Sequence, residues 1–320
     1  MRRFAIPLLA LCAFAVAASA RPTKPPFPAL PDEGAWGKLP PQKKPVLPEW
    51  ARVLAGSLPK TTAKMLELDY FHRAKNPLDP KLAAALRGTV AEALDSEYGK
   101  AAARADLARV PPLKEGQYSD LRGGLLAMRF AKKLTLAGHA ITDDEFAEVL
   151  KHFGPEQTTA IVHTVAYANF HNRLVLALGV KGESPVAPPI DVAFDLAAAT
   201  GVAPARPPWD DLKAVTADGP AVRVEWSKGG FDQLNATMEK QKERKLRIPL
   251  PDKATLDKLP PRERESAQRI LWNTVSSGYQ PEMTRAWFAP LAAFYEEAKP
   301  DRVFTNSAFW VVTRTNDCFY

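Results

Sequence analysis

Cysteine is almost absent from this chain, whose 320 residues include only Cys12 and Cys318. Cys12 lies in an N-terminal stretch that we interpret below as a removable leader, so the mature chain would keep one cysteine. A single cysteine excludes a framework of disulfide bonds within the chain. The fold must therefore be stabilised by packing, for which a content of 46% hydrophobic residues is sufficient.

Motifs for common metal and cofactor chemistries are also missing. None of the five histidines is joined by a carboxylate or cysteine at the spacing of a metal site. There is no glycine-rich phosphate loop, and no G-x-S-x-G nucleophile elbow occurs. The sequence therefore predicts neither a metal site nor a bound cofactor, and it disfavours a serine hydrolase. The histidines are His72, His139, His152, His163 and His171.

The first 20 residues have the pattern of a secretory leader. Arg2 and Arg3 form a basic start, the following apolar run is too short to span a membrane comfortably, and Ala18-Ser19-Ala20 resembles a cleavage site. We therefore expect an exported protein, periplasmic or extracellular, with no membrane segment after cleavage. Cleavage lowers the formal net charge of +7 by two. The sequence has no basic stripe with interleaved aromatic residues, so it does not predict nucleic-acid binding.

Proline divides the remaining chain into segments. Residues 21–48 are proline-dense and are predicted to form an extended, weakly ordered tether. Residues 49–182 are predicted to be one helical domain, and residues 183–260 a proline-rich linker with a charged helix over 231–245. Residues 261–320 are predicted to begin a second helical domain.

Helical periodicity dominates both domains, and no stretch shows convincing alternation with a period of two. We therefore predict an all-α fold. Thr142 and Glu145 have the spacing of a capping box, and Gly154-Pro155 is predicted to start a helix that ends near Leu178. The predicted helices cover residues 49–55, 61–74, 81–94, 98–110, 119–136, 142–153, 155–178, 262–277, 281–298 and 303–313.

The end of the chain combines an apolar helix with the remaining cysteine. Asn316 and Asp317 are good N-cap residues, and Cys318 follows them directly. A cysteine in the first turn of a helix is shifted toward the thiolate by the helix dipole and the free backbone N–H groups. The residues alone leave open a free buried cysteine that only fills the core. The apolar residues expected in the core before it are Val303, Phe304, Ala308, Phe309, Trp310, Val311 and Val312.

These residues resemble a known active-site layout. In the alkylhydroperoxidase D and carboxymuconolactone decarboxylase superfamily, a buried helix and a polar turn precede Cys-x-x-Cys-x-x-x-His at the start of the next helix. Residues 316–320 resemble the first half of that motif, and residues 125–135, 141–146 and 166–174 are similar to the distal half of such a domain. The resemblance implies an alkylhydroperoxidase-D-like helical bundle. It would also place the second cysteine directly after Tyr320, so the chain is expected to be a fragment.

The first domain has the same layout without its thiols. Ser96 and Gly99 stand where the resemblance would place the two cysteines, and Ala103 stands where it would place the histidine. Residues 95–98 parallel residues 317–320, and residues 71–77 parallel residues 294–300. These matches predict a duplicated domain, with an inactive complete first copy and a partial second copy.

The resemblance implies a thiol-dependent peroxidase whose catalytic residue is Cys318. In the family, peroxide oxidises one cysteine to a sulfenic acid, the second cysteine forms a disulfide with it, and a dithiol reductant restores both thiols. Asn306 stands where the family has the glutamate of a proton relay, and an amide cannot carry that proton. The resemblance also implies a homo-oligomer. The alternative hypothesis is a non-catalytic exported helical protein that serves packing or partner binding.

Overall fold

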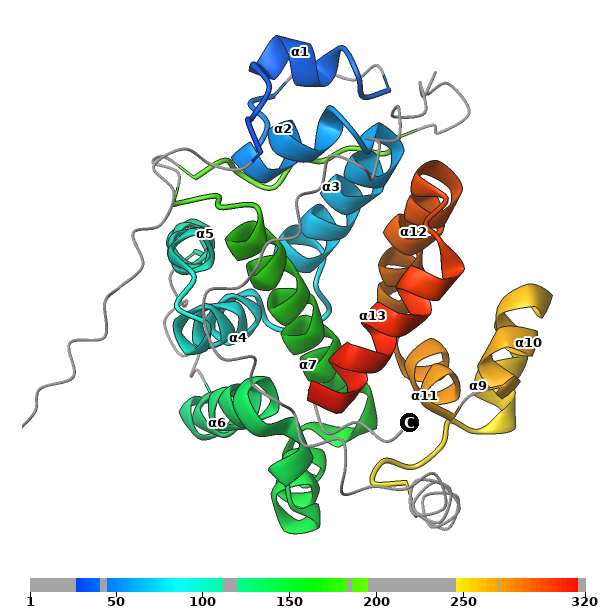
Figure 1. Cartoon of the computed structure of the whole chain (residues 1–320). Coiled ribbons are helices and arrows are strands. Elements are labelled where there is room, and N and C mark those ends of the chain that lie inside the picture. The colour runs from blue at the N-terminus through cyan, green and yellow to red at the C-terminus, as the bar shows by residue number, and fades with distance from the viewer. Residues whose placement is uncertain are drawn as a thin grey trace, which may run out of the picture.

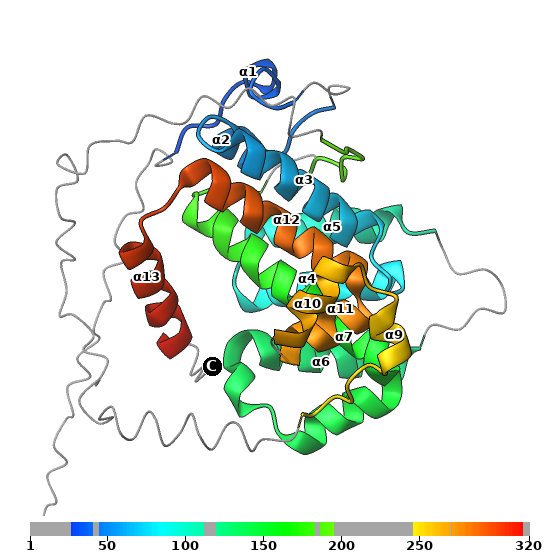
Figure 2. The same ribbon diagram turned by 90° about the vertical axis from the view of Figure 1, so that its right-hand side faces the viewer.

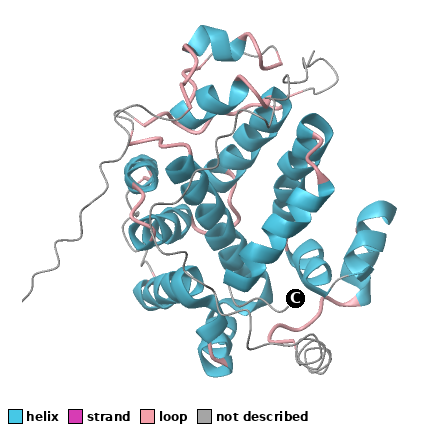
Figure 3. Ribbon diagram, viewed as in Figure 1, coloured by secondary structure: helices cyan, strands magenta, loops and turns pink. Residues whose placement is uncertain are grey.

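The computed structural model describes residues 27–40, 45–111, 120–182, 186–194, 246–269 and 271–315. Within these residues every regular element is a helix and no strand occurs, which confirms the all-α prediction (Figures 1 and 3). The helices are α1 (Asp32–Trp36), α2 (Glu49–Ala55), α3 (Pro59–Ala74), α4 (Pro80–Ala93), α5 (Glu97–Arg109), α6 (Leu121–Ala137), the 3-10 helix η1 (Gly138–Ala140), α7 (Asp143–Ala177), α9 (Lys253–Asp257), α10 (Pro261–Arg269), α11 (Leu271–Tyr279), α12 (Pro281–Ala298) and α13 (Arg302–Thr315).

Local sequence determines where most of these helices begin and end. The predicted capping box of α7 is confirmed, because the Glu145 N–H donates to Thr142 Oγ1 and the Thr142 N–H donates to the Glu145 carboxylate. Gly154 kinks α7 with a φ of 70°, a conformation that glycine adopts without a Cβ clash. Pro155 then restarts the helix, as predicted. Where one helix was predicted over 262–277, the structure has α10 and α11.

Two hydrophobic clusters form the core, and α7 contributes to both. Met283 of α12 is fully buried in the second cluster, so the first helical domain shares its core with the segment predicted to belong to the second. The first cluster includes Trp50, Leu66, Tyr98 and Val175. The second cluster includes Leu86, Val90, Ile161 and Met283.

The prediction of an extended, weakly ordered tether is wrong for residues 27–40, which contain α1, and the described residues 186–194 of the predicted linker pack on the core. Trp36 in α1 is 4% exposed, and its Nε1 donates to the Pro45 carbonyl over 2.9 Å. Ile190 and Phe194 are also buried in the first cluster. Proline density indicates missing backbone N–H donors but does not show whether nearby apolar side chains are buried. Burial of such side chains stabilises these segments. The leader and the predicted charged helix lie outside the described residues.

Helix α12 packs along α3, whereas α13 stands apart from the bundle (Figure 2). Glu297 near the end of α12 accepts hydrogen bonds from the Lys60 and Thr61 N–H groups at the start of α3, each over 2.9 Å. The two helices are therefore antiparallel. The prediction that the apolar side chains of α13 lie in a core is wrong, since Val303 is 74% exposed and Phe309 66%. None of the described helices makes an extended contact with α13.

Helices α12 and α13 follow the pattern of α3 and α4 at a separation of 222 positions (281 minus 59). This separation relates the start of α3 to that of α12, and the start of α4 to that of α13. Leu58 before α3 has φ and ψ of −134° and 59°, and Gln280 before α12 has −137° and 63°. In the first turn of these helices, Thr62 Oγ1 donates to the Leu58 carbonyl over 2.7 Å and Thr284 Oγ1 donates to the Gln280 carbonyl over 2.8 Å.

Candidate functional site: a buried polar network

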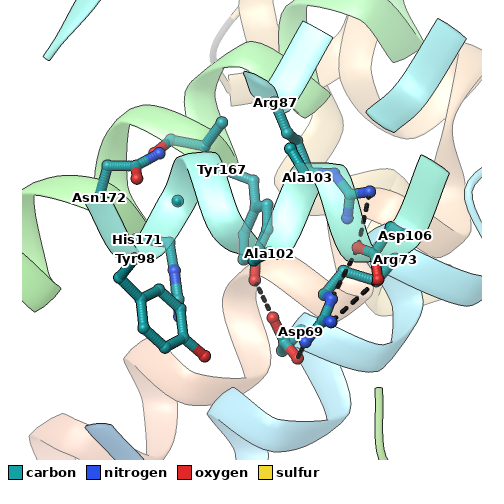
Figure 4. Close-up of a pocket in the computed structure, with 12 residues that line it drawn as sticks. Asp69, Arg73, Arg87, Tyr98, Ala102, Ala103, Asp106, Tyr167, His171 and Asn172 are labelled. Carbon is teal, nitrogen blue, oxygen red and sulfur yellow. Dashed lines mark hydrogen bonds and ion pairs between the residues drawn. The ribbon is translucent and has the colours of Figure 1, made fainter. Parts of the chain in front are cut away.

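A small cavity lies among α3, α4, α5 and α7 and is surrounded by ionisable side chains (Figure 4). Its volume of about 30 Å³ is enough for one or two water molecules. Burying charged side chains is costly unless they pair with one another. The polar lining residues are Asp69 and Arg73 on α3, Arg87 on α4, Tyr98 and Asp106 on α5, and Tyr167, His171 and Asn172 on α7.

Asp106 binds three arginines. Arg73 donates to both of its carboxylate oxygens through Nε and Nη2, each over 2.9 Å, in a bidentate pair. Arg87 Nη2 lies 2.9 Å from the same carboxylate, and Arg109 Nη1 lies 2.6 Å from it. The side chains of Asp106, Arg73 and Arg87 are all less than 10% exposed. The contacts therefore join α3, α4 and α5 through buried charge.

Asp69 is the second buried carboxylate of the network. It accepts hydrogen bonds from Tyr167 Oη over 2.6 Å and from Arg73 Nη1 over 3.1 Å. Burial alone would raise the pKa of Asp69, but the charge of Arg73 and these hydrogen bonds outweigh burial and hold that pKa below its usual range. Burial and the Asp69 charge raise the pKa of Tyr167 well above its ordinary value. The pair is therefore a carboxylate that holds a neutral phenol.

Two histidine rings stack with the Tyr167 ring of this pair. The His72 and Tyr167 rings are parallel with centroids 4.1 Å apart, and the His171 ring lies 5.6 Å from Tyr167. Burial lowers the pKa of His171 to about 4, and burial together with the charges of His163 and Arg87 lowers the pKa of His72 well below its usual value. Neither ring nitrogen of His72 has a hydrogen-bond partner among the described residues. Both histidines are therefore neutral at pH 7.

The contacts of this network are ion pairs among its own side chains. Two carboxylates balance Arg73 and Arg87, while Arg109 completes the cluster with 40% of its side chain exposed. Ser96 Oγ accepts a hydrogen bond from the Gly99 N–H over 3.2 Å as the N-cap of α5. The described residues lining the cavity include no thiol. No cluster of three or more metal-ligating side chains occurs in the described part of the chain.

The structure brings to this cavity two of the three positions at which the resemblance would place cysteine or histidine. Gly99 and Ala103 line it, and Ser96 is fully buried one turn away at the start of α5. Cys318, the predicted catalytic residue, lies outside the described residues. Sequence reasoning missed the charged members of the network. The available indication was an isolated charge on an alanine-rich helix, as for Arg87 in α4.

Gly99→Ala is expected to destabilise the protein by about 1–3 kcal/mol, the usual cost of overpacking. A Cβ atom at Gly99 would lie within 3 Å of Asn172 Oδ1 and of the Ala91 Cβ. The measurement is the free energy of unfolding in urea. The double variant Gly99→Ala/Asn172→Ala should recover part of the loss because it removes the closer of the two contacts. Stability equal to wild type in the single variant would contradict this packing.

Comparisons with known protein families, with curated proteins and with solved structures gave no match. Among the described helices, none is both long and apolar enough to cross a membrane.

Proposed function

We propose that the protein is an exported thiol-dependent peroxidase with two alkylhydroperoxidase-D-like copies. In this proposal the first copy, around Ser96, is inactive. The second copy carries the reaction through a Cys-x-x-Cys site that Cys318 opens in the full-length protein. A homo-oligomer and a dithiol reductant belong to the same proposal, since the resemblance implies both.

The observation that carries the proposal is a common register between the segment around α2 to α4 and the segment around α11 to α13. At the separation of 222 positions, Trp50, Val53, Gly56, Pro59 and Thr62 recur as Trp272, Val275, Gly278, Pro281 and Thr284. The same register pairs Ser96 with Cys318 and Tyr98 with Tyr320. Residues 71–77 and 294–300, which the sequence comparison also pairs, differ from it by one position, because α12 extends further than α3 relative to its start.

The register assigns Cys318 the environment that Ser96 has. Ser96 is fully buried at the N-cap of α5, and its side-chain oxygen accepts the Gly99 N–H. A cysteine sulfur in that place would lie at the N-terminus of a helix, where backbone N–H groups and the helix dipole favour the thiolate. By this register Cys318 would be the N-cap residue itself rather than a residue of the first turn.

The same pairing indicates an apolar substrate. Asp69 and Arg87 line the cavity in the first copy, and at the separation of 222 positions their partners in the second copy are Leu291 and Phe309. A pocket with these two apolar side chains in place of the charged ones would have fewer ion pairs than the first cavity. It would therefore favour an organic hydroperoxide over hydrogen peroxide.

In the proposed reaction the Cys318 thiolate attacks a peroxide oxygen and the O–O bond breaks. The alcohol leaves after taking up a proton, and the sulfur is oxidised to a sulfenic acid. The thiol of the second cysteine then displaces water from the sulfenic acid and forms a disulfide, which an external dithiol reduces by exchange. Asn306 cannot relay the proton, so the proton must come from another group or from solvent.

Cys318→Ser in the full-length protein is expected to abolish the consumption of cumene hydroperoxide with dihydrolipoamide as reductant. The matched control is Ser96→Ala, the equivalent position in the first copy, which should keep wild-type activity. Both variants are assayed for peroxide consumed per minute after circular dichroism has shown unchanged helix content. Wild-type activity in Cys318→Ser, or none in wild type with several dithiols, would reject the redox proposal in favour of the non-catalytic alternative.

A further inference from the structure

A larger, apolar cavity lies between α2, α3, α7 and α12, and its volume is about 450 Å³. Met65 and Leu68 line it from α3, and Trp287 and Pro290 line it from α12. In the register of the two segments Met65 corresponds to Trp287, and Leu68 to Pro290. The cavity therefore lies where equivalent parts of two antiparallel helices meet. Phe170 of α7 adds a third wall, with its ring 5.6 Å from that of Trp287.

The lining offers almost nothing to a polar ligand. Thr61 is the one polar residue among the described residues that line the cavity. Its N–H and its Oγ1 both donate to Glu297 Oε2, over 2.9 and 2.8 Å. A charged ligand would leave water without gaining a partner. An anionic one would also be repelled by the Glu297 carboxylate.

The volume distinguishes a small molecule from a helix of another protein. Small-molecule pockets span about 300–1,000 Å³, so this cavity is within their range. A helix 10–12 Å across with a pitch of 5.4 Å fills roughly 400–600 Å³ per turn, so the cavity would accept about one turn. One turn is too short to anchor a partner helix, whereas the whole of a small hydrocarbon ligand would be enclosed.

We propose that this cavity binds an uncharged, largely hydrocarbon small molecule. The Asp106 network lines a different cavity, and this proposal does not depend on the proposed peroxidase activity. Burial of the ligand's apolar surface against Met65, Leu68 and Trp287 supplies the binding free energy.

The probe for this site is the neutral dye N-phenyl-1-naphthylamine, titrated into the protein while its fluorescence is recorded. Wild type is expected to show saturable binding of one dye per chain. Phe170→Glu should weaken binding at least tenfold, because the new carboxylate would have to be desolvated in the cavity wall. The matched control is Leu176→Glu, which changes a residue on the same helix with similar exposure, 42% against 38%, outside the cavity lining.

Equal dye affinity in Phe170→Glu and Leu176→Glu, or no saturable binding by wild type, would overturn the proposal. The anionic dye 1-anilinonaphthalene-8-sulfonate should bind at least tenfold more weakly than the neutral dye, and equal affinity would overturn the uncharged ligand class. A wild-type dimer that excludes the dye, and that Phe170→Glu converts to a dye-binding monomer, would show that a second copy occupies the cavity. Cys318→Ser should bind the dye as wild type does, which keeps this test independent of the peroxidase assay.

Discussion

Replacing Asp106 with asparagine is expected to lower the free energy of unfolding by about 3–5 kcal/mol, the usual cost of removing one partner of a buried ion pair. The carboxylate binds Arg73, Arg87 and Arg109, so its loss removes the charge that all three guanidinium groups share. Asparagine has nearly the same shape, which keeps the packing of α5 unchanged. The loss would be a large share of the 5–15 kcal/mol that stabilises a typical domain.

The measurement is urea unfolding followed by circular dichroism at pH 7. The matched control is Glu148→Gln, which breaks the single ion pair with Arg129, where the side chains are 49% and 66% exposed. An exposed pair of this kind contributes about 1 kcal/mol or less. If Asp106→Asn cost no more than Glu148→Gln, the buried network would not stabilise the fold as we infer.

Acidification is expected to destabilise the protein steeply between about pH 6.5 and pH 4. Burial lowers the pKa of His163 and of His171 to about 4, whereas an unfolded histidine titrates near 6.5. Between these values the unfolded chain binds protons that the folded chain does not, so stability falls as pH falls. Each of the two histidines should contribute about 3 kcal/mol across the whole window. His72 acts in the same direction, because its pKa is also lowered by burial.

Asp69 extends the loss of stability below about pH 4, beyond the histidine window. Its pKa is lowered in the folded protein, so its stabilising effect is complete above the pKa of an unfolded aspartate and disappears as pH falls toward the folded value. The test is urea unfolding at half-unit steps from pH 7 to pH 4. His171→Phe should flatten the pH dependence because it keeps an aromatic ring and removes the titrating group. His139→Gln, which replaces an exposed histidine, should keep the full pH dependence. A slope unchanged by His171→Phe would contradict the buried neutral histidine.

Helix positions were predictable because the interactions that start and stop helices are local. The capping box of Thr142 and Glu145 links residues three positions apart, and Pro281 begins α12 where a missing N–H has no cost. The close approach of Asn172 to Gly99 could not be predicted from the sequence, because the two residues lie on different helices.

The charged network could not be predicted in the same way. Asp106 lies on α5, and two of its arginines lie on α3 and α4, so their meeting depends on how three helix faces are oriented. An isolated arginine in an alanine-rich helix reads equally well as a solvent-exposed residue. Long-range contacts also place Met283 in the second hydrophobic cluster, across the predicted domain boundary, and Trp36 against Pro45, within the predicted tether.

The sequence by itself determined the all-α class and the approximate positions of helices such as α7 and α12, because both depend on residues a few positions apart, whereas α1 and α9 were not predicted. Only the tertiary structure decided which charges are buried together and which apolar faces are covered. Val303 and Phe309 have the periodicity of core residues, yet they are exposed because burial requires a facing surface, which the periodicity of one helix cannot supply.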